Sequence, residues 1–174
     1  MPKIIENIRE KLLDEAKRQV MEHGYSSMTI RSVATACGVG TGTVYNYFPS
    51  KDMLVASFML EDWMICIQNI GRGTAEAKDA GEALFCMYQE LLTYKEKYDS
   101  LFADENAEAS YMASSTQRHH LLRAQLAEPI KIWTQKQTKT DADFLADFIA
   151  ENMLTWSMKG CEFEKIAEVL LQLL

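Results

Sequence analysis

The apolar residues of this 174-residue chain recur with the period of an α-helix over most of its length. The first such stretch carries apolar residues every three to four positions, with charged residues on the other faces. These apolar positions are Ile5, Ile8, Leu12, Ala16 and Val20. Gly24 follows, and glycine accepts the left-handed conformation that ends many helices. The pattern predicts a first helix over about residues 5–23.

Two shorter helices are predicted between residues 29 and 48. The Thr29 hydroxyl can accept a backbone N–H from the first turn of a helix over 30–37. Gly38 provides the stop, and a third helix is expected over 41–48, immediately before Pro49. Two short helices joined by a tight turn that contains glycine form a helix-turn-helix.

The rest of the chain also reads as helical, and few prolines or glycines interrupt it. Further helices are predicted over about 51–70, 80–94, 98–112, 114–137 (kinked at Pro129), 141–158 and 162–174. The stretch Gly71-Arg72-Gly73-Thr74 has the composition of a linker. The predicted fold class is therefore all-α. A three-helix DNA-binding domain over 4–65, with its helix-turn-helix at 29–48, is joined to a helical domain over 66–174.

Charge is distributed unevenly along the chain, whose net charge is −7. Residues 1–55 carry seven Lys and Arg against six Asp and Glu, whereas residues 56–174 carry eleven against nineteen. The acidity therefore belongs to the second part. Exposed charges are screened within about 10 Å at 0.1 M salt, so a distant acidic domain does not prevent the first part from binding phosphate.

The run GYSSMTIRSVATACGVGTGTVYNYFPSKDML, residues 24–54, resembles the signature of the TetR family. Glycines, aromatic residues, cap residues and the terminal Ser-Lys-Asp all fall in register, and the resemblance extends over roughly the first 65 residues. It implies a sequence-specific DNA-binding transcription regulator. Two departures stand out, because the family usually has Ser or Thr where this chain has Gly40 and often has Lys where it has Thr41.

The helix-turn-helix supplies the candidate DNA contacts. Asn46 can pair with an adenine edge in the major groove, and the hydroxyls of Tyr45 and Tyr47 suit phosphate. The resemblance implies phosphate contacts for Thr29, Tyr45 and Lys51, although Thr29 is also a helix cap without DNA. Either Tyr47 or Phe48 should pack inward, with Phe48 the better core residue. The full candidate set is Thr29, Arg31, Thr41, Gly42, Thr43, Tyr45, Asn46, Tyr47 and Lys51.

The resemblance implies that the second domain forms a homodimer and binds an effector. Two apolar stripes near the C-terminus exceed what one small domain easily buries, so some residues are expected to pack across a two-fold axis; the alternative is a core within one chain. The candidate interface residues are Phe144, Phe148, Met153, Trp156, Ile166 and Leu170. The candidate residues for a pocket that takes a small apolar or aromatic effector are Trp63, Phe85, Tyr88, Phe102, Tyr111 and Trp133.

The sequence favours a cytoplasmic repressor that binds a palindromic operator in double-stranded DNA and is released by its effector. The alternative is an effector-independent DNA-binding protein whose second domain binds a protein partner. An enzyme is disfavoured because the chain lacks G-x-S-x-G, Walker A and H-E-x-x-H motifs, and neither a metal nor a cofactor is expected. The four cysteines are expected to be free thiols, and no uncharged apolar run reaches the roughly 20 residues that a membrane span needs.

Overall fold

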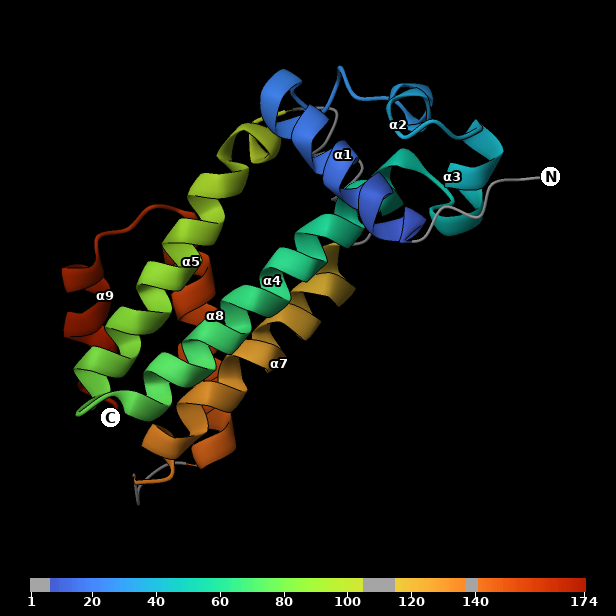
Figure 1. Cartoon of the computed structure of the whole chain (residues 1–174). Helices are drawn as coiled ribbons and strands as arrows, with labels where there is room; N and C mark the ends of the chain where they lie inside the picture. The colour runs from blue at the N-terminus through green and yellow to red at the C-terminus, as the bar shows by residue number, and fades with distance from the viewer. Residues whose placement is uncertain (1–6, 105–114, 137–140) are drawn as a thin grey trace. The chain divides into compact units, whose positions relative to one another are not determined.

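The structure, a computed structural model, describes residues 7–104, 115–136 and 141–174 (Figure 1). Every regular element in these residues is an α-helix, so the predicted all-α fold class is confirmed. The helices are α1 (Ile8–His23), α2 (Ile30–Ala36), α3 (Thr41–Tyr47), α4 (Lys51–Glu76), α5 (Ala80–Phe102), α7 (Ser115–Thr134), α8 (Ala142–Met158) and α9 (Phe163–Leu170). The predicted helix over 98–112 lies only partly within the described residues, where its beginning continues α5.

The described residues divide into two compact units. The first unit consists of the chain up to Asp62 together with the end of α5, from Tyr98. The second unit consists of residues 63–97 and the chain from α7 onward. The chain therefore leaves the first unit inside α4 and re-enters it inside α5. The predicted domain boundary at residue 65 places the end of α5 in the second domain, whereas the structure groups it with the first unit.

The first unit is held together by apolar packing beneath α1 and by polar contacts from α4. Leu12, Ala16 and Val20 of α1 are almost fully buried, as the helical period requires. On α4, Asp62 accepts a hydrogen bond from Lys17 at 2.7 Å and another from the Tyr98 hydroxyl. One carboxylate thus ties three helices together.

The second unit has a continuous apolar core formed by the later part of α4, the first part of α5, and α7, α8 and α9. Asp141 caps α8 by accepting a hydrogen bond from the Phe144 backbone N–H at 2.8 Å, at the start of the helix predicted over 141–158. Gly160, just past the predicted end, follows the helix with a φ of +73°. The last helix stops at Leu170, short of the predicted residue 174.

The predicted linker at 71–74 is wrong, because these residues continue α4 without a break. The physical reason is close packing against α5. A Cβ atom at Gly73 would lie 2.0 Å from Sγ of Cys86, so a side chain fits there only if Cys86 moves. Thr74 is buried, and its hydroxyl donates to the carbonyl of Ile70 at 2.8 Å inside the helix.

Half of the candidate dimer residues belong to the chain's own core. Met153, Ile166 and Leu170 are 0–1% exposed and lie in the apolar cluster of the second unit, so the alternative of a core within one chain applies to them. Trp156 packs partly against the same core. Phe144 and Phe148, in contrast, are 65% and 43% exposed on α8.

The candidate effector residues that the structure describes fall in both units. Trp63, Tyr88 and Trp133 are core residues whose polar atoms donate to Gln125, to the carbonyl of Cys161 and to the carbonyl of Thr74, respectively. Phe85 is half-exposed and meets Phe163 edge to face, whereas Phe102 belongs to the first unit. Tyr111 lies outside the described residues.

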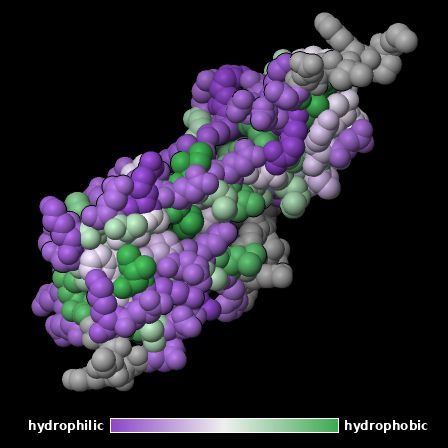
Figure 2. Space-filling view, turned by 60° about the horizontal axis from the view of Figure 1, so that its bottom comes forward, coloured by the Kyte–Doolittle hydropathy of each residue, from purple (hydrophilic) through white to green (hydrophobic). Residues whose placement is uncertain are grey.

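One helix within the described ranges, α4, has the length and apolar composition that could cross a membrane. Phe58, Trp63 and Ile70 of this helix are buried inside the protein, whereas Leu60 and Ile65 are more than half exposed. On the face shown in Figure 2, hydrophobic side chains form separate small areas among hydrophilic ones. A single helix of this composition is weak evidence for a membrane span.

Candidate nucleic-acid interface

The helix-turn-helix begins at a reciprocal cap on α2. The Thr29 hydroxyl accepts the backbone N–H of Ser32 at 3.0 Å, and the Ser32 hydroxyl accepts the backbone N–H of Thr29 at 3.1 Å. Met28 before the cap and Val33 after it are both buried, as in a hydrophobic staple. This arrangement confirms the predicted helix start and fixes the direction in which α2 leaves the preceding loop.

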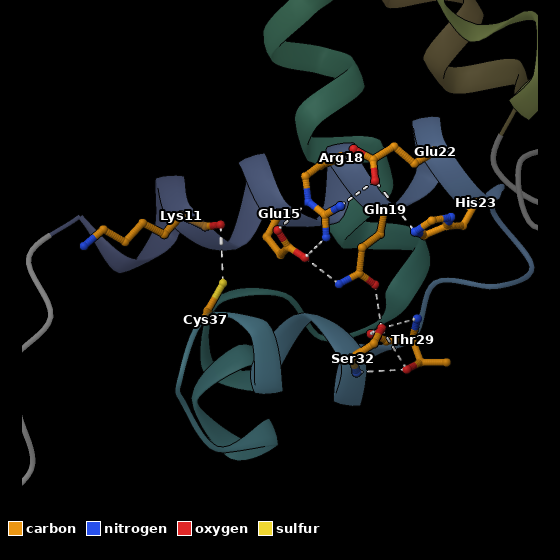
Figure 3. Close-up of polar contacts among 9 residues, drawn as sticks. All are labelled: Lys11, Glu15, Arg18, Gln19, Glu22, His23, Thr29, Ser32 and Cys37. Carbon is orange, nitrogen blue, oxygen red and sulfur yellow. Dashed lines mark hydrogen bonds and ion pairs between the residues drawn. The ribbon is translucent and has the colours of Figure 1, made fainter.

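A polar network joins this cap to α1, as Figure 3 shows. The Ser32 hydroxyl donates to Oε1 of Gln19 at 2.6 Å, and Nε2 of Gln19 donates to Glu15 at 2.8 Å. Arg18 pairs with Glu15 at 2.7 Å. The hydrogen bond from Arg18, followed by that from Gln19, lowers the pKa of Glu15 from 4.5 to about 2. The carboxylate therefore remains charged and holds the network at neutral pH.

Sequence reasoning missed Gln19. The signal was present, because Gln19 follows Leu12 and Ala16 at helical spacing and so falls on the core-facing stripe of α1. A polar side chain at such a position needs hydrogen-bond partners, and Gln19 has Ser32 and Glu15.

The turn between α2 and α3 is fixed by its backbone. Gly38 adopts a φ of +67°, its N–H donates to the carbonyl of Thr35, and the N–H of Val39 donates to the carbonyl of Ala34 at 2.9 Å. This pair of bonds is the Schellman motif, which satisfies the last carbonyls of α2. Gly40 precedes α3 without a side-chain cap, as expected from the missing hydroxyl.

α3 separates its residues cleanly into two faces. Val44 and Phe48 are buried against the first unit, which confirms Phe48 as the packing residue. Tyr45 and Tyr47 are 52% and 45% exposed, and Asn46 between them is also exposed. The helix is therefore anchored by two apolar side chains and presents a row of hydrogen-bonding groups to solvent.

An open groove of about 440 Å³ lies beside this exposed row. Its lining residues are Ser26, Met28, Thr29, Ile30, Arg31, Thr41, Tyr45 and Lys51. Five of the nine candidate DNA contacts, namely Thr29, Arg31, Thr41, Tyr45 and Lys51, are thus brought together. The other four, Gly42, Thr43, Asn46 and Tyr47, lie on α3 outside this lining. The gathered groups are hydroxyls and cations, which are the donors that bind phosphate oxygens.

Lys51 is more enclosed than the sequence predicts. Its ammonium donates to the carbonyl of Tyr25 at 2.6 Å and lies 3.9 Å from the centre of the Tyr25 ring. Burial lowers the pKa of Lys51, while the nearby carboxylates of Asp104 and Asp52 act in the opposite direction. The charge of Lys51 therefore fastens the start of α4 to the loop before α2 as well as facing the groove.

These features define a helix-turn-helix protein, and comparison with known proteins agrees. Residues 12–58 match the family described as bacterial regulatory proteins, tetR family. The transcriptional repressor Rv1474c of Mycobacterium tuberculosis is 35% identical over 66 residues, which cover 36% of this chain and 35% of that repressor. This chain thus matches about a third of the length of that relative.

Similarity of fold extends over nearly the whole chain. The TetR-family repressor AlkX of Dietzia sp. aligns with a TM-score of 0.69 at 15% identity and covers 94% of this chain and 98% of its own. The Thermus thermophilus repressor FadR, solved with lauroyl-CoA, aligns with a TM-score of 0.60 at 16% identity, covering 95% and 92%. At such identities the likeness concerns the fold alone. Residues 12–58 thus match the family's DNA-binding segment, and the whole chain shares the fold of these TetR-family repressors.

Proposed function

We propose that this protein is a homodimeric, cytoplasmic transcription repressor that binds a palindromic operator and is released by a small-molecule effector. The observation that carries the proposal is the exposed face of α3, where Tyr45, Asn46 and Tyr47 are held outward by buried Val44 and Phe48. A helix of this kind inserts into the major groove and contacts base edges from its outer face.

The residues divide by chemistry into those that position the protein and those that read the sequence. Tyr45, Thr29 and Arg31 carry donors that suit phosphate oxygens, and all three line the groove beside α3. Asn46 has an amide that can bond both N6 and N7 of an adenine. Gly42 has no side chain and no neighbour within 4 Å of a Cβ position, so the backbone can approach the DNA closely there.

Dimerisation is required for a palindrome to be read, because two copies of α3 must enter major grooves about 34–36 Å apart. The exposed apolar residues of α8 and of the C-terminal segment support an interface there. They are Phe144, Phe148, Val169, Leu171 and Leu173. Of the predicted interface set, this retains Phe144 and Phe148 and replaces the buried residues with exposed neighbours.

The effector is proposed to be apolar or aromatic, and it would act on the second unit. FadR of Thermus thermophilus, which shares the fold, was solved with lauroyl-CoA, an acyl thioester with a long apolar chain. Release needs little energy, because a tenfold loss of operator affinity corresponds to about 1.4 kcal/mol of coupling between the two sites.

The first test is selection of bound fragments from a random DNA pool, followed by affinity measurements over a range of salt concentrations. Binding should recover a two-fold symmetric sequence and weaken steeply with salt. Arg31→Ala should reduce affinity for every duplex and make the salt slope shallower by about 0.9, while Lys11→Ala, which removes an exposed charge outside the groove, should change it less. Asn46→Ala should relax discrimination at one base pair by about 1–3 kcal/mol.

A purified protein without salt-sensitive attraction to any duplex would contradict the proposal. If Arg31→Ala and Asn46→Ala changed binding in the same way, the division between positioning and reading would be wrong. The effector is tested separately by operator binding at a saturating concentration of each candidate compound.

A further inference from the structure

The end of α5 is firmly seated in the same unit as the helix-turn-helix. The Tyr98 ring stacks on Phe58 with 6.2 Å between ring centres, and its hydroxyl donates to Asp62. Leu101, one turn later, is only 1% exposed. The backbone N–H of Asp104 then donates to the carbonyl of Leu101 at 3.3 Å. The position of Asp104 is therefore set by a packed helix end.

The Asp104 carboxylate reaches a residue of the groove. The Ser26 hydroxyl donates to Oδ2 of Asp104 at 3.1 Å, with Oδ1 at 3.4 Å. Ser26 lines the groove together with Lys51, and the charge of Asp104 is near enough to raise the pKa of Lys51 against the effect of burial. A carboxylate outside the lining thus bonds a hydroxyl of the groove.

A carboxylate and a phosphate compete for such groups, because both are oxyanions that accept hydrogen bonds from hydroxyls and ammonium groups. The carboxylate also repels a phosphate that approaches. Both effects apply to DNA of any sequence, since phosphates carry no sequence information. A protein with this carboxylate is less attracted to DNA of any sequence, whereas its contacts with base edges are unchanged.

We propose that Asp104 is an anionic competitor of DNA phosphate, whose carboxylate accepts a hydrogen bond from Ser26 of the groove and weakens the sequence-independent part of DNA binding. The inference rests on the proposed function of the helix-turn-helix. It adds an anionic competitor from a distant part of the chain to the donors that the helix-turn-helix supplies.

The test compares Asp104→Asn, which removes the charge but keeps the size, with the unchanged protein on a random-sequence duplex. Fluorescence polarisation at several salt concentrations gives affinity and salt slope together. Asp104→Asn should bind random DNA about three- to tenfold more tightly at 0.1 M salt. Its salt slope should be steeper by about 0.9, because Lys51 then releases a counterion to a phosphate.

Two further variants separate the local effect from total charge and from folding. Asp104→Glu keeps the charge and should bind random DNA with the affinity and slope of the unchanged protein. Asp14→Asn removes an exposed carboxylate of the same unit that does not line the groove, and should leave the slope unchanged. A thermal unfolding curve for each variant confirms that it is folded.

The inference is overturned if Asp104→Asn binds random DNA no more tightly than the unchanged protein, or if Asp14→Asn has an equal effect. Weaker binding by Asp104→Asn would also overturn it, because Asp104 would then support the fold of the groove. An unchanged protein that binds no duplex would instead refute the proposed function, so the two failures are distinguishable.

Discussion

Two glycines near the end of α4 test how closely this helix packs against α5. Both lie inside the helix, two residues apart. A Cβ at Gly73 would lie 2.0 Å from Sγ and 3.3 Å from Cβ of Cys86, whereas a Cβ at Gly71 would meet nothing within 4 Å. Substitution by alanine therefore adds the same methyl group to the same helix, once into a contact and once into open space.

The expected free-energy changes have opposite signs. At an open helical position, Gly→Ala stabilises by about 0.5–1 kcal/mol, because alanine loses less backbone entropy. Gly71→Ala should show this gain in full. At Gly73 the same gain is offset by overpacking, which costs about 1–3 kcal/mol because Cys86 must move. Gly73→Ala should therefore be less stable than Gly71→Ala by about 1–3 kcal/mol.

Urea unfolding at one fixed protein concentration measures the difference, with the denaturation midpoint as readout and an equal m value as the check that only stability changed. Cys86→Ala removes the clashing sulfur. The double variant Gly73→Ala/Cys86→Ala, compared with Cys86→Ala alone, should therefore show little of the stability loss that overpacking causes in Gly73→Ala. If Gly73→Ala were as stabilising as Gly71→Ala, the close approach of the two helices would be refuted.

Three further outcomes follow from polar and buried groups. Asp62→Asn should lower the free energy of unfolding by about 1–3 kcal/mol in urea titrations, whereas Glu61→Gln, in a half-exposed pair with Arg9, should cost less than about 1 kcal/mol. The folded-state pKa of Glu15 is lowered from 4.5 to about 2. The charged carboxylate therefore stabilises the fold above pH 4.5, and this stabilisation is lost as pH falls toward 2. In urea unfolding at a series of pH values, Glu15→Gln should lack that part of the acid dependence. Burial, and to a smaller extent nearby charges, raises the pKa of the Cys66 thiol to about 12. Alkylation of Cys66 in the native protein, followed by mass spectrometry, should therefore be at least about a hundredfold slower than that of an ordinary exposed thiol.

The helix-turn-helix could be predicted from the sequence because its boundaries are set by local chemistry. Thr29 caps α2 through its own hydroxyl, and Gly38 supplies the left-handed residue that ends it. Asp141 and Gly160 define α8 in the same way. At each of these positions the residue that signals the boundary also makes the bond or adopts the backbone angle that creates it.

The failures occurred where residues distant in sequence decide the structure. Gly73 signals a linker by composition, but Cys86 on the next helix explains why a glycine lies inside α4. Helical spacing shows that Met153 and Leu170 lie on apolar faces, but it does not distinguish a core within one chain from an interface between two. Their burial in the second unit answers that question. Asp104 carries no local signal, because its partner Ser26 is 78 positions away.

The correction at Gly73 bears directly on how an effector could control DNA binding. Because α4 continues through 71–74, one unbroken helix carries both Thr74, whose carbonyl accepts a hydrogen bond from Trp133 in the second unit, and Lys51 at the groove of the first. The first turn of α4 is fastened to Tyr25 by the Lys51 ammonium and by a hydrogen bond from the Tyr25 hydroxyl to Asp52. Under the proposed function, a ligand whose binding to the second unit favours one state of the protein over another by about 1.4 kcal/mol would suffice for a tenfold change in operator affinity, without unfolding any element.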